Sequence, residues 1–145
     1  FVYNTNLEYV WLDTKYSGDF NKVHDIQSEY LQKAAAAGRS VEILIGLPAD
    51  DQLNEFLQLP DYSSIPSLCE LTLDNVRTIN AKVWAPRWTL GTQNSEVDQV
   101  HSEGRKAFTW TMDVPAYIND FINQGKFDGI LSNYPSIVAY YEYVK

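Results

Sequence analysis

The chain has 145 residues, of which 45% are hydrophobic and 14% aromatic, and this apolar content suits a single packed core. Its formal net charge of −8, from 19 acidic and 11 basic residues, argues against a surface for duplex nucleic acid or an anionic membrane, because either partner needs a basic face. The single cysteine, Cys69, excludes an intrachain disulfide and a cysteine-rich metal cluster. We therefore expect one domain over residues 1–145, in which any phosphate ligand needs a local positive site.

Strand-like and helix-like segments alternate in the first part of the chain. Residues 8–15 (EYVWLDTK) are a short aromatic and β-branched run typical of a strand. Residues 21–37 carry apolar side chains at three- to four-residue spacing, which predicts a helix with Gly38 at its left-handed C-terminus. Residues 41–48 (VEILIGLP) are almost uninterruptedly apolar, as in a strand covered on both faces. The predicted buried face of the helix consists of Val23, Ile26, Tyr30 and Ala34.

The alternation continues after one ambiguous segment. Residues 60–80 are hard to interpret, since LCELTL (68–73) fits either a short strand or a helical turn. Ser95 and Asp113 are expected to cap the helices that follow them, and Gly104 to end the first of these helices. The other predicted elements are a helix at 50–59, a strand at 81–88, a helix at 95–104, a strand at 105–112, a helix at 114–125, a strand at 127–134 and a helix at 136–145.

Repeated strand–helix units with connections of this length predict a parallel sheet with right-handed crossovers. Two α/β architectures fit the pattern, an open doubly wound sheet of five strands and part of a (β/α) barrel. A complete barrel typically takes about 250 residues, so a barrel built from this chain would lack roughly two βα units. In both architectures ligands bind at the carboxyl ends of the strands.

Two opposite charges, Asp13 and Lys15, end the first predicted strand. Side chains alternate along a strand, so Trp11, Asp13 and Lys15 share one face and emerge together. A buried unpaired charge costs several kcal/mol, so the two must pair with each other, with a metal or with a charged ligand. One alternative is a structural ion pair. The other is a site in which Asp13 binds a divalent cation and Lys15 meets a phosphate, although one carboxylate is too few for a cation site.

Other polar and aromatic residues near strand ends are weaker candidates. Trp110 is either a core residue or a wall of a ligand cleft, and Arg87 is either an anion contact or an exposed loop residue. His24 and His101 fall inside predicted helices, so neither is placed for acid–base chemistry at a strand end. Cys69 is expected to be a small buried residue. Asp113 and Asp128 are interpreted as a helix cap and a turn former, respectively.

Three segments together resemble the C-terminal part of the glycerophosphodiester phosphodiesterase family. They are VWLDTK (10–15), FTWTMD (108–113) and FDGILSNYP (127–135). The family carries an acidic-x-Lys strand end, then a W-T-x-[ND] strand, then a final D-G-[IL]-x-[ST]-[DN]-x-P strand. The related sphingomyelinase D-like enzymes share that ending, often with Asn in place of Asp.

The resemblance implies an incomplete (β/α)8 TIM-type barrel, comprising about strands three to eight, that hydrolyses glycerophosphodiesters with a bound Mg²⁺ or Ca²⁺. Residue by residue, it implies that Asp13 is a metal ligand and that Lys15 is the lysine beside the phosphate. It also implies that Trp110 is an aromatic residue of the substrate cleft. Asn133 replaces the commoner Asp, which leaves its role open. A slight preference for an extracytoplasmic location also follows from the resemblance.

Three family motifs have no counterpart at the strand ends of this sequence. The family's first strand ends in His-Arg-Gly, its second in Glu-x-Asp, and a second His follows. We therefore expect this chain to be inactive alone and to derive from a longer precursor, since it also begins without Met and runs almost directly into a strand. We further expect the open outer strand edges to be covered by the missing N-terminal segment, by another copy or by a rearranged strand. The alternatives are a non-catalytic fragment or degenerate homologue acting as a binding or structural module, and an unrelated doubly wound anion-binding protein.

Overall fold

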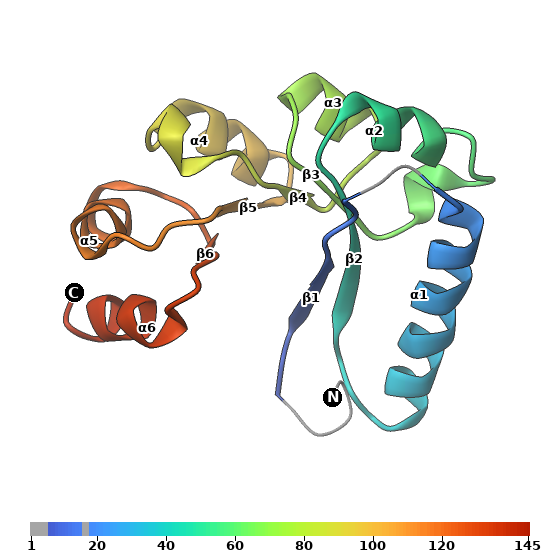
Figure 1. Ribbon diagram of the computed structural model, residues 1–145, viewed down its shortest axis with the longest axis horizontal. Helices are drawn as coiled ribbons and strands as arrows, with labels where there is room; N and C mark the ends of the chain where they lie inside the picture. The colour runs from blue at the N-terminus through green and yellow to red at the C-terminus, as the bar shows by residue number, and fades with distance from the viewer. Residues whose placement is uncertain (1–5, 16–17) are drawn as a thin grey trace. The chain divides into compact units, whose positions relative to one another are not determined.

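The structure is a computed structural model that describes residues 6–15 and 18–145 (Figure 1). A helix follows each strand along the chain, as the sequence pattern predicts. Contacts divide the chain into two compact units, Phe1–Lys82 and Val83–Lys145. No helix in the described part of the chain is long and apolar enough to cross a membrane.

The first unit contains three parallel strands in chain order. β1 pairs with β2 from Tyr9↔Glu42 to Leu12↔Ile45, and β2 pairs with β3 from Ile45↔Ser67 to Leu47↔Cys69. Parallel neighbours need a crossover between them, and helices supply it here. The elements are β1 (Tyr9–Leu12), α1 (Phe20–Ala36), β2 (Glu42–Leu47), α2 (Asp50–Phe56), the 3-10 helix η2 (Tyr62–Ser64), β3 (Ser67–Cys69) and α3 (Leu73–Thr78).

The ambiguous segment at 60–80 contains both a strand and a helix. Ser67, Leu68 and Cys69 form β3 and are buried. Thr72 then caps α3, because its side chain accepts a hydrogen bond from the Asn75 N–H. Residues 6–15 and 18–145 therefore contain six strands, in place of the five that periodicity alone indicates.

β2 forms the centre of the first unit. Its residues from Ile43 to Leu47 are all buried, which confirms that the strand is covered on both faces. Gly46 is needed there because the Trp11 indole from β1 occupies the space where a Cβ would lie. A side chain at that position would also approach the Leu12 carbonyl to 2.9 Å. β1 and β2 thus interlock through a tryptophan and a glycine.

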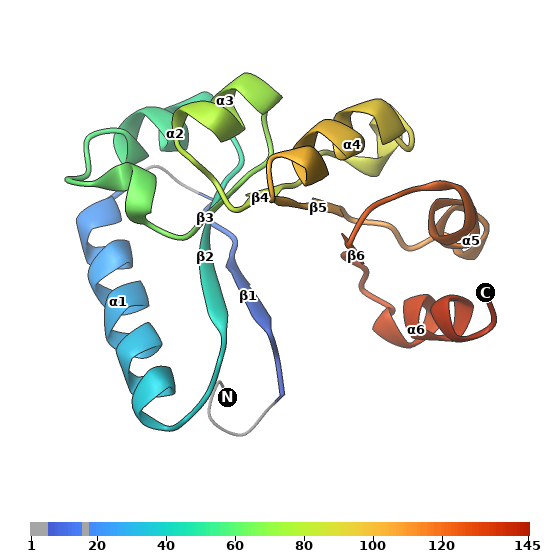
Figure 2. The same cartoon turned by 180° about the vertical axis from the view of Figure 1, so that it is seen from behind.

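The buried face of α1 differs from the predicted one. Ile26 and Tyr30 are 47% and 41% exposed, whereas Phe20, Gln27 and Ala34 are buried. These three residues are spaced by seven, so they lie on one side of the helix two turns apart. Because Gln27, the middle residue of the three, is polar, the hydrophobic pattern of the sequence did not indicate this buried face. Figures 1 and 2 show α1 lying along β2 in both views.

Gln27 is buried because its amide joins α1 to the sheet. Its Nε2 donates to the carbonyl of Ile43 at 2.6 Å and to that of Pro66 at 2.7 Å. The first carbonyl belongs to β2 and the second immediately precedes β3. One side chain therefore ties the helix to two adjacent strands, and burial is tolerated because its donors are satisfied.

The second unit repeats the arrangement with shorter strands. β4 pairs with β5 (Val83↔Lys106, Trp84↔Ala107), and β5 pairs with β6 (Phe108↔Gly129, Thr109↔Ile130), both in parallel. Its elements are β4 (Val83–Trp84), the 3-10 helix η3 (Trp88–Leu90), α4 (Asn94–Ser102), β5 (Lys106–Thr109), α5 (Pro115–Gln124), β6 (Gly129–Ile130) and α6 (Pro135–Tyr143).

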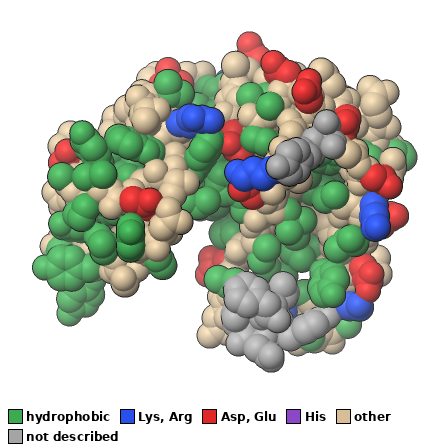
Figure 3. Space-filling model, in the orientation of Figure 1, with side chains coloured by type: hydrophobic (Ala, Val, Ile, Leu, Met, Phe, Trp, Pro, Cys, Tyr) green, Lys and Arg blue, Asp and Glu red, His purple; other side chains and the backbone are tan. Residues whose placement is uncertain are grey.

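A small apolar core joins α5 and α6 in this unit. Met112, Ile118, Phe121 and Ile122 are buried, and side chains including Ile137 and Val138 of α6 pack on them. No residue of α6 is buried, however. Tyr140 and Tyr143 are exposed, and Figure 3 shows hydrophobic side chains gathered over this helix. The apolar content of α6 is therefore only partly used within its own unit.

Two predicted helix caps are wrong and the predicted glycine positions are right. α4 begins at Asn94, with Gln93 as its N-cap at a φ of 41°, so Ser95 is already inside the helix. Val114 precedes α5, and Asp113 does not cap it because its carboxylate binds elsewhere. Gly38 and Gly104 have φ values of 70° and 73°, the left-handed conformation expected after a helix.

Replacing Gln27 with Leu is expected to lower the free energy of unfolding by about 1–3 kcal/mol, because the carbonyls of Ile43 and Pro66 lose a buried donor. Chemical denaturation monitored by circular dichroism measures the change. Gln32, exposed on the same helix, provides the matched control, and Gln32→Leu should change stability by less than about 0.5 kcal/mol. Equal effects of the two substitutions would contradict the role given to the Gln27 amide.

Candidate functional site

Polar side chains gather after the carboxyl ends of the strands in both units. This is the edge at which (β/α) barrels and doubly wound sheets bind ligands. β1, β3, β4 and β5 are each followed closely by a charged or aromatic side chain, and β6 by two polar ones. These residues are Asp13 and Lys15 after β1, Glu70 after β3, Arg87 after β4, Trp110 and Asp113 after β5, and Ser132 and Asn133 after β6.

Asp13 and Lys15 form a direct ion pair, with Lys15 Nζ 2.7 Å from Asp13 Oδ2. β1 ends at Leu12, so both charges lie in the loop beyond the sheet, where they are 49% and 69% exposed, respectively. The predicted strand 8–15 therefore ends three residues early, and the cost of a buried unpaired charge does not apply to this pair. An exposed pair of this kind contributes about 0–1 kcal/mol to stability. The geometry matches the ion-pair alternative, and the roles of both residues toward a cation and a phosphate stay predictions.

Thr14, between the two charges, holds their loop against the end of β2. Its Oγ1 donates to the carbonyl of Gly46 at 2.5 Å. This bond attaches the loop that carries Asp13 and Lys15 to β2. The ion pair thus has a defined position although both of its members are exposed.

The described residues do not by themselves fit a divalent cation. Mg²⁺ demands six oxygen ligands at about 2.0–2.1 Å and Ca²⁺ six to eight, usually with more than one carboxylate. No group of three or more His, Cys, Asp or Glu side chains in residues 6–15 and 18–145 has the spacing of a metal site. Asp13 brings one carboxylate, which already pairs with Lys15.

Arg87 and Trp110, the two predicted substrate-binding residues, lie together in the second unit. They face each other as a parallel bridge beyond the ends of β4 and β5. The Arg87 guanidinium carbon lies 4.7 Å from the centroid of the Trp110 ring, within the range of a cation–π interaction. Arg87 and Trp110, which the sequence presented as two separate candidates, therefore form one cation–π pair.

Hydrogen bonds to the chain after β4 fix the Trp110 ring. Its Nε1 donates to the carbonyl of Ala85 at 2.7 Å. Next to it, the buried Thr109 Oγ1 donates to the carbonyl of Pro86 at 3.1 Å. The side chains of Thr109, the last residue of β5, and of the following Trp110 therefore satisfy two carbonyls where the regular ladder ends. The Trp110 ring, over which the Arg87 guanidinium lies, is consequently held in one orientation.

Asp113 joins the ends of β5 and β6. Its Oδ2 accepts from Asn133 Nδ2 at 2.7 Å, and its Oδ1 accepts from the Asn133 backbone N–H at 2.8 Å and from Ser132 Oγ at 3.1 Å. The side-chain and backbone N–H groups of Asn133 lower the pKa of Asp113 below its ordinary value of 3.8, burial opposes this, and Ser132 adds to the lowering. Asp113 is thus a clamp between strand ends and not the predicted helix cap.

Asp128 and the histidines lie away from the strand ends considered above. Asp128 precedes β6 and accepts from the Ala107 N–H, His101 Nε2 and Lys106 Nζ at 2.8, 2.8 and 3.0 Å. Burial opposes ionisation of Asp128, but these hydrogen bonds outweigh it and hold its pKa below the ordinary value. His101 is in α4 and His24 in α1, as predicted. Asp128 therefore anchors the start of β6, at the amino end of the strand.

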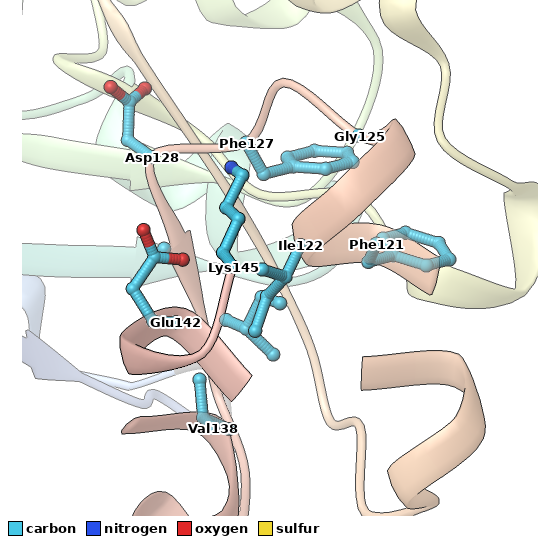
Figure 4. A pocket seen from close by; sticks show the side chains of 10 residues that line it. Phe121, Ile122, Gly125, Phe127, Asp128, Val138, Glu142 and Lys145 are labelled. Atoms are coloured by element: carbon cyan, nitrogen blue, oxygen red, sulfur yellow. The ribbon is translucent and has the colours of Figure 1, made fainter. Parts of the chain in front are cut away.

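The described cavities also lie toward the amino ends of strands. One of about 330 Å³ is lined by the end of α5, the segment leading into β6 and the end of α6, with Phe127, Asp128 and Lys145 among its residues (Figure 4). Another of about 490 Å³ lies between α1 and the 60–66 loop, beside His24 and Asp61. Neither is lined by a predicted site residue.

Glu70 is the strand-end residue that sequence reasoning missed. It directly follows β3, and its N–H donates to the carbonyl of Leu47 at 3.1 Å, which continues the ladder with β2. The signal was its position in LCELTL, the segment that fitted strand and helix equally well. Recognising a strand there would have placed a carboxylate two strands away from Asp13.

Cys69 is buried at the end of β3 and is expected to be unreactive in the folded chain. Burial raises the pKa of its thiol to about 11, so almost no thiolate is present near neutral pH. Reaction with an aromatic disulfide reagent at pH 8 should be slow and follow unfolding, and it should become fast in denaturant. A fast reaction under native conditions would contradict this burial.

Replacing Asn133 with Asp is expected to lower the melting temperature at pH 7, because two carboxylates would face each other where an amide now donates. The deficit should shrink as the pH falls toward 4, since one carboxyl then takes up a proton. In the unsubstituted chain the contribution of Asp113 is complete above its ordinary pKa of 3.8 and is lost as the pH falls through the lower folded value.

The double variant Asp113→Asn/Asn133→Asp should recover most of the lost stability, because it restores one amide and one carboxylate. Asn54→Asp, at an exposed position outside the clamp, is the matched control. A double variant that melts below the single variant at pH 7 would contradict the pairing.

The sequence matches no protein-family model and no curated protein. Two solved structures have a similar fold. A glycerophosphodiester phosphodiesterase from Parabacteroides distasonis aligns with a TM-score of 0.61 at 14% identity, over 95% of this chain and 57% of its own. A proposed glycerophosphoryl diester phosphodiesterase from Silicibacter pomeroyi aligns with a TM-score of 0.63 at 20% identity, over 92% of this chain and 49% of its own. The chain spans about half the length of each, so its fold is that of an incomplete (β/α)8 barrel similar to glycerophosphodiester phosphodiesterases, as the three motifs predicted.

Proposed function

We propose that this protein is a phosphoric diester hydrolase that acts on glycerophosphodiesters. One observation carries the proposal: the three resembling segments end at the carboxyl ends of β1, β5 and β6, in a fold similar to two structures that bear this enzyme's name. A barrel enzyme places its chemistry at that edge. The likeness by itself supports the fold, and the residues at the edge support the chemistry.

Lys15 would neutralise negative charge on the phosphoryl group. Its ammonium is the more exposed member of the ion pair, so a phosphate oxygen can reach it without disrupting the core. Charge that develops on the phosphoryl oxygens is stabilised best by a cation held in place beforehand, and the loop bonded through Thr14 provides such a position. Asp13 would keep the ammonium at the strand end until a substrate arrives.

Asp13 would in addition supply one carboxylate to a Mg²⁺ or Ca²⁺ site. Its remaining ligands would have to come from outside the described residues, because these hold no group of three acidic, histidine or cysteine side chains suited to a metal. The groups that transfer protons would also come from elsewhere, since both histidines of this sequence lie in helices. On this proposal the chain is inactive alone.

Trp110 and Arg87 would be the substrate-binding residues of the second unit. The ring is fixed by Ala85, and the guanidinium on it offers N–H groups to an anionic oxygen. The outer strands β1 and β6 would be covered by the missing N-terminal segment or by another copy. Tyr9 of β1 is exposed and both residues of β6 are only half-buried, which supports such a cover.

A non-catalytic binding or structural module is the second candidate. The direct Asp13–Lys15 contact favours it, because each charge already has the other as partner. In a degenerate homologue the ion pair would have only a structural role at the end of the strand. The two candidates differ in whether the intact protein turns over a phosphodiester.

The test is release of glycerol phosphate from glycerophosphodiesters by the longest chain that the gene encodes, with Mg²⁺ or Ca²⁺ present. Asp13→Asn and Lys15→Ala are each expected to lower kcat by about a hundredfold or more, as the loss of a transition-state charge contact does. The exposed α1 ion pair provides matched controls, and Glu29→Gln and Lys33→Ala should leave kcat unchanged. Unchanged activity in Asp13→Asn would remove it from the site, and a folded protein without turnover would favour the binding module.

A further inference from the structure

One face of the Trp110 ring is occupied by a positively charged group. The Arg87 guanidinium carbon lies over this face, 4.7 Å from the ring centroid. A tryptophan ring is otherwise the best side-chain surface for a quaternary ammonium group. A choline-type head group at this ring would have to displace the guanidinium or lie beside a like charge.

Arg87 is also available to an anion. Its side chain is exposed, and no carboxylate among the described residues forms an ion pair with it. Asp113, the acidic residue that follows the adjoining strand β5, already accepts three hydrogen bonds from Ser132 and Asn133. Although the chain has a net charge of −8, the Arg87 guanidinium thus lies at a strand end without a carboxylate partner in the described part of the chain.

We propose that Arg87 is a specificity-determining residue. The guanidinium held on Trp110 excludes quaternary ammonium head groups and admits phosphodiesters whose head group is a neutral or anionic polyol. The substrate class named here rests on the proposed function, whereas the preference of this surface for an anion over a quaternary ammonium does not. Arg87 acts through binding, so its effect lies in KM and not in kcat.

Titration of the chain with inorganic phosphate and with choline chloride, followed by the indole N–H signals in ¹⁵N-correlated NMR spectra, tests the surface itself. The chain has four tryptophans, and Trp110→Phe identifies the Trp110 signal by its loss. Phosphate is expected to shift this signal in the unsubstituted chain and choline to leave it unchanged. Arg87→Gln should lose the response to phosphate and bind choline about two- to thirtyfold more tightly, the range of a cation–π contact.

Arg87→Lys keeps the charge and should still exclude choline, and Arg77→Gln, which alters an arginine paired with Asp74, should behave like the unsubstituted chain. Equal choline binding by the unsubstituted chain and Arg87→Gln would overturn the inference. So would an unchanged Trp110 signal in phosphate.

The enzymatic arm compares kcat/KM for glycerophosphoinositol and glycerophosphocholine in the intact protein. The ratio should favour glycerophosphoinositol and fall by about two- to thirtyfold in Arg87→Gln, through a lower KM for glycerophosphocholine. A merely structural role would change both substrates equally and would overturn the inference. If neither substrate is hydrolysed, the proposed function fails and the indole titration alone decides the inference.

Discussion

Parallel pairing of strands is the constraint on which the candidate site depends. It brings the carboxyl ends of neighbouring strands to one edge, whatever their separation in the sequence. In the second unit this places Arg87 opposite Trp110 and brings Asn133 to Asp113. In the first unit it brings Thr14 to the end of β2. The chemistry available at the edge follows from which residue each strand happens to end on.

Side-chain hydrogen bonds supplement the few backbone hydrogen bonds between the short strands. β4 and β6 have two residues each, too few for a ladder that aligns strand ends by itself. Thr109 and Trp110 bind the carbonyls after β4, and Asp113 binds the residues after β6. The same device operates at Gln27, which binds carbonyls on two strands from a helix. Polar residues that would be expected at the surface thus fix the strands and α1 in position.

The sequence predicted those parts of the fold that depend on local pattern. The run 41–48 is a buried strand because its apolar residues are continuous, and Gly38 and Gly104 end helices because they adopt positive φ. The buried face of α1 was missed because Gln27 is polar and is satisfied only by carbonyls brought to it by tertiary structure. Asp113 was assigned to the nearest helix because its true partner, Asn133, is distant in sequence.

For the site, the sequence identified side chains but not their partners. Arg87 and Trp110 were each singled out, yet nothing local indicated that one lies on the other. Asp13 and Lys15 were placed within the first strand because its pattern was extended beyond Leu12, where the pairing with β2 in fact ends. Glu70 was missed because a three-residue strand carries too little periodicity to be recognised.

The bond between Asp113 and Asn133 gives the family motifs a different meaning. Each motif allows either an amide or a carboxylate, at the end of W-T-x-[ND] and in the [ST]-[DN] pair. In this chain those two variable positions are the two members of one hydrogen bond. A bond of this kind needs one donor and one acceptor, so the choice at one position constrains the choice at the other. The two positions should therefore vary together among proteins of this fold, so that an amide at one position is accompanied by a carboxylate at the other.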